Sequence, residues 1–313
     1  MTQVLIAGIP RSGTSWIEKT LACARGAVSI HEPDNENLHA LAVRAKRRLG
    51  RFPVLEPGES APTYERLWRR ALSGGTPRPQ TLRDAVTKRI FPLRTRDSDP
   101  AFSPVRIRLA AAMASTTPRH DVPPHVIVKS VHCALALRWI YESFRPRVVI
   151  VLRHPFAIIA SQLRMQMKDR DARLYMNPSI LSRAAEKWGL TLPAASISPV
   201  ERTAWQVGLL ISVLTDAASQ YPEWQVVVHE DICSAPVEHF RTLYSDLGLE
   251  WTQSAEDFVL LSDQPGMGYK SQRLAAMEVD RWRTSLDIKD RELTQRTLSA
   301  FPLVTSRFEG MEQ

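Results

Sequence analysis

The chain has 313 residues, of which 44% are hydrophobic, and it carries a formal net charge of +8 at pH 7. This hydrophobic content is enough to bury a large core and excludes an intrinsically disordered chain. The positive charge favours an anionic ligand, so nucleic acid has to be considered as a partner.

Cysteine usage and hydropathy indicate the compartment. Cys23, Cys133 and Cys233 are odd in number and far apart, which argues against a disulfide framework or a zinc ribbon. The first residues run directly into a strand pattern, and apolar stretches fall far short of the roughly 20 residues that a membrane span needs. We therefore expect a soluble, cytoplasmic protein with no transmembrane segment.

Short β-branched runs alternate with longer helical patterns, which is typical of a parallel sheet covered by helices. The pattern predicts helices at 14–24, 133–144, 155–168, 200–220 and 236–247. It predicts five strands, at Val4–Gly8, Ala27–His31, Val126–Lys129, Val148–Leu152 and Trp224–His229. The fold class is therefore α/β, with a five-stranded parallel sheet between helical layers. We expect a single domain over 1–313.

Residues 34–125 interrupt this pattern with many prolines and arginines. One helix is expected there, at 64–72, and no strand pattern is convincing. We predict a mainly helical insertion that covers one edge of the sheet or closes over a substrate, and the two roles are compatible.

A glycine loop joins the first strand to the first helix, in VLIAGIPRSGTSW (4–16). Backbone N–H groups and the helix dipole make such a turn an anion site. Gly8 and Gly13 have the spacing of a phosphate-binding P-loop, but Thr14 stands where that motif has lysine. Arg11 supplies a cation from inside the loop instead. The sequence therefore predicts a P-loop-like fold with an altered phosphate site.

The fourth strand ends in an arginine, where P-loop nucleotidases have the aspartate that helps to hold magnesium. Arg153 follows the apolar run VVIVL and would attract an anion but repel a metal. We therefore expect phosphate groups to be neutralised by arginines, with no metal required. Ser161 lies two helical turns further on and reaches the same anion only if the segment between them bends back.

The segments PRSGTSW (10–16) and RHPFAIIASQL (153–163) together resemble the two cofactor signatures of the sulfotransferases. These enzymes take a sulfuryl group from 3′-phosphoadenosine 5′-phosphosulfate (PAPS) and release 3′-phosphoadenosine 5′-phosphate (PAP). The segments 227–249 and 280–286 are also similar to that family, whereas the insertion is not covered.

The resemblance implies a role for each matched residue. The 5′-phosphosulfate would be held by Arg11, Ser12, Gly13, Thr14 and Ser15, with Trp16 near the adenine. Arg153 and Ser161 would hold the 3′-phosphate. The chain departs from the family at His229, where tyrosine is frequent. Its counterpart of the family's basic C-terminal loop is GMGYKSQR (266–273), from which Lys270 or Arg273 would contact the 3′-phosphate.

Sulfuryl transfer to a hydroxyl requires a general base beside the acceptor oxygen. Glu32 follows the second strand and precedes a proline, which resembles the base of the carbohydrate sulfotransferases. His132 follows the third strand and resembles the base of the cytosolic sulfotransferases, although Val131 is inserted before it. We favour Glu32, keep His132 as the alternative and His31 as a weaker third candidate. Lys129 is expected to contact the sulfuryl group.

The predicted function is sulfuryl transfer from PAPS to a hydroxyl of a small-molecule, glycan or lipid acceptor. The sequence is compatible with either a monomer or a homo-oligomer. One alternative is a P-loop kinase-like phosphotransferase, which the missing loop lysine and Arg153 disfavour. The other is a basic nucleic-acid-binding module. It is disfavoured because no zinc, RNP or basic-zipper pattern is recognisable and the charge is spread along the chain. We therefore expect no nucleic-acid partner.

Overall fold

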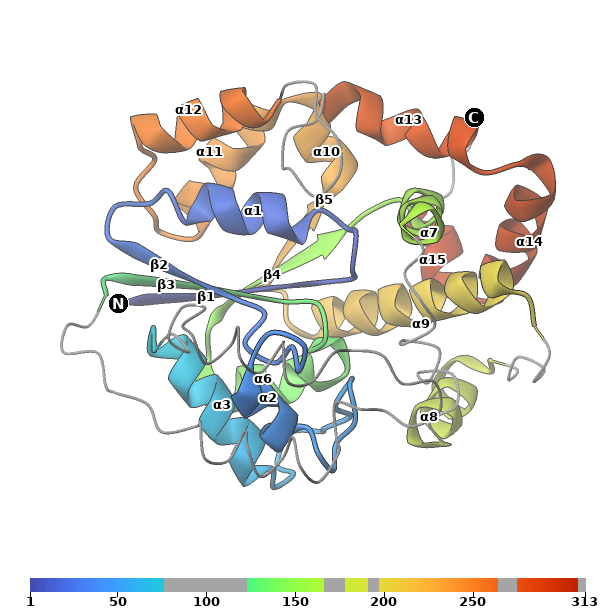
Figure 1. The fold of residues 1–313 in the computed structure, drawn as a ribbon, viewed down its shortest axis with the longest axis horizontal. Helices are drawn as coiled ribbons and strands as arrows, with labels where there is room; N and C mark the ends of the chain where they lie inside the picture. The colour runs from blue at the N-terminus through green and yellow to red at the C-terminus, as the bar shows by residue number, and fades with distance from the viewer. Residues whose placement is uncertain (76–122, 166–177, 191–196, 264–274, 309–313) are drawn as a thin grey trace, which may run out of the picture.

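The computed structural model describes residues 1–75, 123–165, 178–190, 197–263 and 275–308. Within these ranges the chain forms a five-stranded sheet of order β2-β3-β1-β4-β5, flanked on both faces by helices (Figure 1). Every strand pairing is parallel, which confirms the expected α/β fold class. The strands are β1 (Thr2–Gly8), β2 (Ala27–His31), β3 (His125–Ser130), β4 (Arg147–Leu152) and β5 (Gln225–Val228).

The helices of the described residues have the following bounds: α1 (Thr14–Leu21), α2 (Ala40–Ala45), α3 (Pro62–Leu72), the 3₁₀ helix η2 (Ala134–Ala136), α6 (Leu137–Phe144), α7 (Pro155–Arg164), α8 (Pro178–Trp188), α9 (Pro199–Gln220), α10 (His229–Ser234), α11 (Pro236–Asp246), α12 (Gln253–Ser262), α13 (Ala275–Ser285), α14 (Ile288–Leu298) and α15 (Pro302–Phe308). α1, α11 and α12 lie on one face of the sheet, and α3, α6 and α9 lie on the other (Figure 1). None of the helices in the described ranges is long and apolar enough to cross a membrane.

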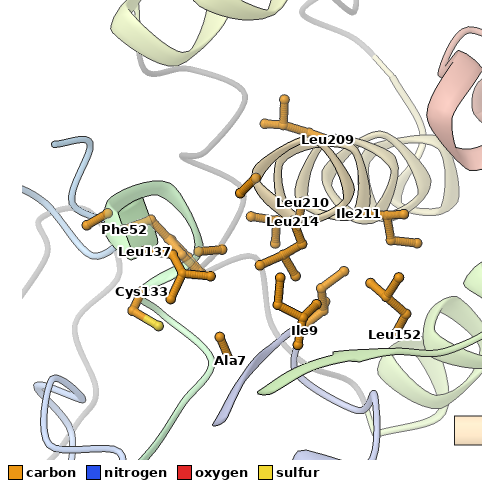
Figure 2. Close-up of a cluster of buried hydrophobic side chains, with 14 of the residues drawn as sticks. Ala7, Ile9, Phe52, Cys133, Leu137, Leu152, Leu209, Leu210, Ile211 and Leu214 are labelled. Atoms are coloured by element: carbon orange, nitrogen blue, oxygen red, sulfur yellow. The ribbon is translucent and has the colours of Figure 1, made fainter. Parts of the chain in front are cut away.

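Alternate side chains of β1 point into two separate cores, as the pleat of a strand requires. Val4 and Ile6 pack on the α1 side, whereas Leu5 and Ala7 pack on the α9 side. Figure 2 shows part of the second core, where apolar side chains of α9 lie over the ends of β1 and β4. Because both faces are covered, the central strands are apolar throughout, which made them recognisable in the sequence.

Strand register brings the carboxyl ends of the central strands to one level. Ala7 of β1 pairs with Ser130 of β3 and with Ile150 of β4, and His31 of β2 pairs with Lys129 of β3. Residues that directly follow these strands therefore gather at one edge of the sheet, where open α/β sheets place their sites.

The described part of the insertion contains α2 and α3, and α3 confirms the helix that was expected at 64–72. α3 begins with Pro62 in its first turn, a favourable position for proline. It buries Tyr64 and Trp68 completely against the core of the α9 side. Residues 76–122, which make up the rest of the insertion, lie outside the described residues.

The last strand is shorter than predicted, since it ends at Val228 and His229 begins α10. The reason is local: Glu230 and Asp231 lie in the first helical turn, where acidic side chains are favoured by the helix dipole.

Candidate active site

Two residues with positive φ bend the glycine loop between β1 and α1: Arg11 at 79° and Gly13 at 95°. The left-handed region suits glycine, whereas for arginine it carries a cost that the surrounding structure has to offset. Gly13 is also the N-cap of α1 and contributes no side chain to it. The first N–H groups of α1 are therefore directed at the loop, which is the arrangement that binds anions.

Ser12 lies at the centre of this loop. Its Oγ is buried and has no hydrogen-bond partner among the described residues. Gly8 keeps the space beside it open, because a Cβ there would lie 2.8 Å from Ser12 Oγ and 3.0 Å from the backbone oxygen of Val151. An unpaired buried hydroxyl costs about 1–3 kcal/mol. A phosphate or sulfate oxygen would satisfy this hydroxyl, so the loop fits the anionic end of a ligand that carries such a group.

Arg11 of the loop lies together with two other residues proposed for phosphate binding, Arg153 and Ser161. Arg11 Nε donates to Ser161 Oγ at 2.9 Å, and Arg153 Nη1 donates to the backbone oxygen of Arg11 at 3.2 Å. Gln162 also donates from its side chain to the backbone oxygen of Pro10, at 3.0 Å. Ser161 reaches the site because α7 starts immediately after β4 and runs alongside the glycine loop.

Glu230 lies beside Arg153 and helps to position it, a role that our sequence reasoning missed. Its Oε1 lies 4.0 Å from Arg153 Nε and accepts the backbone N–H of His154 at 3.1 Å. Burial raises the pKa of Glu230, while that N–H and the charge of Arg153 oppose the rise. The available signal was the acidic pair directly after the last strand.

The proposed base and the proposed sulfuryl-binding cation form an ion pair at the ends of β2 and β3. Lys129 Nζ donates to Glu32 Oε1, and Asn35 Nδ2 donates to Glu32 Oε2 at 2.5 Å. Glu32 has a φ of 45°, and its N–H donates to the backbone oxygen of Lys129 at 2.7 Å. Burial alone would raise the pKa of Glu32, but the charge of Lys129 and the hydrogen bonds from Lys129 and Asn35 hold it below its usual value.

His132, the alternative base, is buried behind this pair. Its Nε2 lies 3.3 Å from Arg51 Nη2, and the ring of Phe52 packs edge-on at 5.2 Å. Burial lowers the pKa of His132 well below its usual value, and the charges of Lys46, Arg51 and Lys129 lower it further. A guanidinium only donates hydrogen bonds. His132 Nε2 can therefore only accept in this contact, and taking up a proton there would break the contact with Arg51.

His31, the weaker third candidate, is engaged elsewhere. Its side chain is half exposed, and its Nδ1 lies 2.6 Å from Glu18 Oε2 of α1. Its Nε2 is 4.0 Å from Glu32 Oε1, so a protonated His31 would further lower the pKa of Glu32.

A buried polar network, which our sequence reasoning also missed, fixes the segment after Glu32. Asp34 Oδ1 accepts from Ser130 Oγ at 2.7 Å, and Lys46 Nζ donates to the backbone oxygen of Asp34 at 2.8 Å. Glu36 accepts from Lys46 at 3.0 Å and from Arg51 at 2.8 Å. The network thus ties the glutamate segment to β3 and holds Arg51 beside His132.

The remaining predicted cofactor residues lie in the first turn of α1. Thr14 is buried, whereas Ser15 and Trp16 are partly buried. Trp16 Nε1 donates to Ser262 Oγ at 2.7 Å, and the centroid of its ring is 6.1 Å from the centroid of the His229 ring. His229 packs directly on the loop, since a Cβ on Gly13 would lie 2.3 Å from His229 Cδ2. The predicted contacts from Lys270 and Arg273 fall outside the described residues.

This chain matches the sequence profile described as "Sulfotransferase family" over residues 3–253. It therefore belongs to the sulfotransferase family and is a transferase. Among curated proteins, none matches the chain significantly.

Solved structures with a similar course of the chain include three sulfotransferases. The sulfotransferase domain from the curacin biosynthetic pathway is 16% identical, with a TM-score of 0.49 over 95% of this chain and 96% of that one. The sulfotransferase domain of the Synechococcus PCC 7002 olefin synthase is 14% identical, with a TM-score of 0.40 over 95% and 94%. Sulfotransferase STF9 from Mycobacterium avium is 15% identical, with a TM-score of 0.41 over 96% and 76%.

Proposed function

We propose that this sulfotransferase transfers a sulfuryl group from PAPS to a hydroxyl of a small-molecule, glycan or lipid acceptor, with Glu32 as the general base. The observation that carries the proposal is the Glu32–Lys129 pair, which lies at the ends of neighbouring strands on the same sheet edge as the glycine loop. A base and a cation are thereby available beside an anion-binding loop.

The donor's two anionic ends correspond to two groups of residues. The N–H groups at the start of α1, Ser12 Oγ and Arg11 suit the 5′-phosphosulfate. Arg153 and Ser161, which both contact Arg11, suit the 3′-phosphate. Charge-assisted hydrogen bonds of this kind are stronger than neutral ones. Arginines would neutralise the phosphates in this arrangement, and the expectation that no metal is required remains a prediction.

The reaction needs one proton transfer and one exchange of bonds at sulfur. As the acceptor oxygen forms its bond to sulfur, its proton passes to Glu32. The bond from sulfur to the 5′-phosphate oxygen breaks, and the phosphate leaves as part of PAP with the negative charge. Lys129, Arg11 and the loop N–H groups would stabilise that growing charge.

The contact between Lys129 and Glu32 has a consequence for the order of events. An ammonium group paired with the carboxylate lowers its basicity. When Lys129 turns toward a sulfuryl group, Glu32 loses this partner and becomes a stronger base. Donor binding would thus prepare Glu32 to accept the proton.

His132 is the less favourable base, because its Nε2 lone pair faces Arg51 and its pKa is strongly lowered. We assign it to positioning of the acceptor side of the site, together with Phe52.

Nucleotide binding tests the proposal without knowledge of the acceptor. PAP should raise the Tm in the absence of magnesium. At a concentration of 100 times its Kd, it should increase the free energy of unfolding by about 2.7 kcal/mol. ATP should give a much smaller shift. A strict requirement for magnesium together with a preference for ATP would instead indicate a kinase-like phosphotransferase.

A further inference from the structure

A hollow of about 90 Å³ lies between α8, α9, the η2–α6 segment and the chain at 54–56. Its walls are mainly aliphatic with one aromatic side chain, and they include Leu55, Leu135, Ile180, Trp188, Leu209 and Val213. A concave site of this composition binds apolar groups by removing them from water.

The charged side chains that line the hollow are paired with each other. Lys187 Nζ lies 2.5 Å from Asp216 Oδ2, and Arg138 Nη1 lies 3.5 Å from Glu56 Oε2. Two cations therefore balance two anions, and the hollow offers no net charge to a ligand. An uncharged group suits it better than the phosphates of the donor.

Two segments that form a wall of the hollow also carry residues of the candidate active site. Leu55 follows Phe52, and Leu135 follows His132. Leu55 N–H donates to the backbone oxygen of Leu135 at 3.4 Å, which joins the segments. A few residues before these positions, Phe52 packs edge-on against His132. Figure 2 shows Phe52 and Leu137 on one side of the core and the leucines of α9 on the other. Two of the lining segments are therefore joined by short stretches of chain to Phe52 and His132, which we assign to the acceptor side of the site.

We propose that this hollow binds an uncharged hydrocarbon group of the hydroxyl acceptor. A cavity of about 150 Å³ holds the six carbons of benzene, so the hollow of about 90 Å³ has room for about four carbon atoms. The acceptor assignment rests on the proposed sulfuryl transfer, whereas hydrocarbon binding itself does not.

Straight-chain primary alcohols from ethanol to octanol provide a matched series of probes. We would titrate protein labelled at the isoleucine δ-methyl groups and follow Ile180, which lines the hollow, by NMR. Ile232 belongs to the core on the opposite face and is the internal control. Each added methylene should lower the Kd about fourfold, the equivalent of about 0.8 kcal/mol, until about four carbons are bound. A Kd that does not depend on chain length, or no response of Ile180, would overturn the inference.

Filling the hollow tests its location. Ala184→Phe on α8 and Ala217→Leu on α9 place a larger side chain in the lining and should each raise the Kd for butanol at least tenfold. Ala185→Phe, at an exposed neighbouring position of α8, is the matched control and should bind butanol normally. Unchanged butanol binding in both filled variants would contradict the inference.

Transfer assays test whether the hydrocarbon belongs to the acceptor. With PAPS as donor, the KM for the alcohols should fall with chain length, and Ala217→Leu should raise the KM for butanol but not that for ethanol. A KM that is independent of chain length would overturn the acceptor assignment. Stabilisation by PAP is measured in parallel: if it fails while butanol still binds at Ile180, the proposed function is wrong and hydrocarbon binding stands.

Discussion

Lys129 of β3 reaches across the sheet edge to Glu32 at the end of β2, so the two groups that we assign to the chemistry are paired with each other. The pairing makes a largely buried carboxylate tolerable, and it keeps that carboxylate ionised at neutral pH because it lowers the pKa of Glu32. The same contact links the charge of the lysine to the basicity of the glutamate.

Lys129→Met should therefore destabilise the protein in a pH-dependent way. Since the folded-state pKa of Glu32 is lowered, the pair stabilises the fold above the unfolded-state pKa, and this stability is lost as pH falls through the folded-state value. Without Lys129, burial raises the pKa instead, so the variant should lose stability as pH rises toward neutrality. The loss at neutral pH should not exceed about 3–5 kcal/mol.

Urea unfolding from acidic to neutral pH measures this effect. Lys129→Met combined with Glu32→Gln is the matched control, because it removes the unpaired charge and should recover most of the loss. An equal loss at every pH would show that Lys129 stabilises the fold by packing alone.

Ser12→Ala should have opposite effects on the free and the nucleotide-bound protein. Its Oγ is buried without a hydrogen-bond partner in the described part of the chain, so its removal should leave the Tm unchanged or raise it. Binding of PAP should weaken about tenfold, because the 5′-phosphate loses the hydrogen bond from the Ser12 hydroxyl. Ser130→Ala is the contrasting control: it removes a bond to Asp34 and should lower the Tm of the free protein. A lower Tm for Ser12→Ala would indicate that this hydroxyl already has a structural role.

Arg153→Ala should discriminate between nucleotides. The affinity for PAPS or PAP should fall about 10- to 100-fold, whereas that for adenosine 5′-phosphosulfate, which lacks the 3′-phosphate, should change little. The substitution also leaves the buried Glu230 without its neighbouring cation. Arg153→Ala combined with Glu230→Gln is therefore the control for stability. Equal losses for both nucleotides would assign Arg153 to the fold or to the 5′ side.

The sheet and its helices could be predicted from the sequence, because strands buried on both faces are continuous apolar runs such as VVIVL. The glycine loop and Arg153 could also be placed at one edge, since carboxyl ends of parallel strands meet there. Contacts between distant segments could not be predicted. The pairing of Arg11 with Ser161 depends on how α7 passes the loop.

Lys46 shows why the network behind the site escaped detection. It begins a run of three cations that resembles a solvated helix face, and Arg47 and Arg48 are indeed exposed. Lys46 is completely buried, because Glu36 and the backbone oxygen of Asp34 accept its hydrogen bonds. Neither partner can be recognised before the segment after Glu32 has been placed in three dimensions.

The identity of the general base is the central claim, and single-turnover transfer from PAPS with donor binding measured in parallel tests it most directly. Glu32→Gln keeps the shape of the side chain but cannot take up a proton, so the rate should fall about 10²–10⁴-fold while PAP affinity stays near that of the wild type. His132→Asn should cost far less, through positioning alone. A near-normal rate in Glu32→Gln together with a collapse in His132→Asn would contradict this account and assign proton transfer to the histidine.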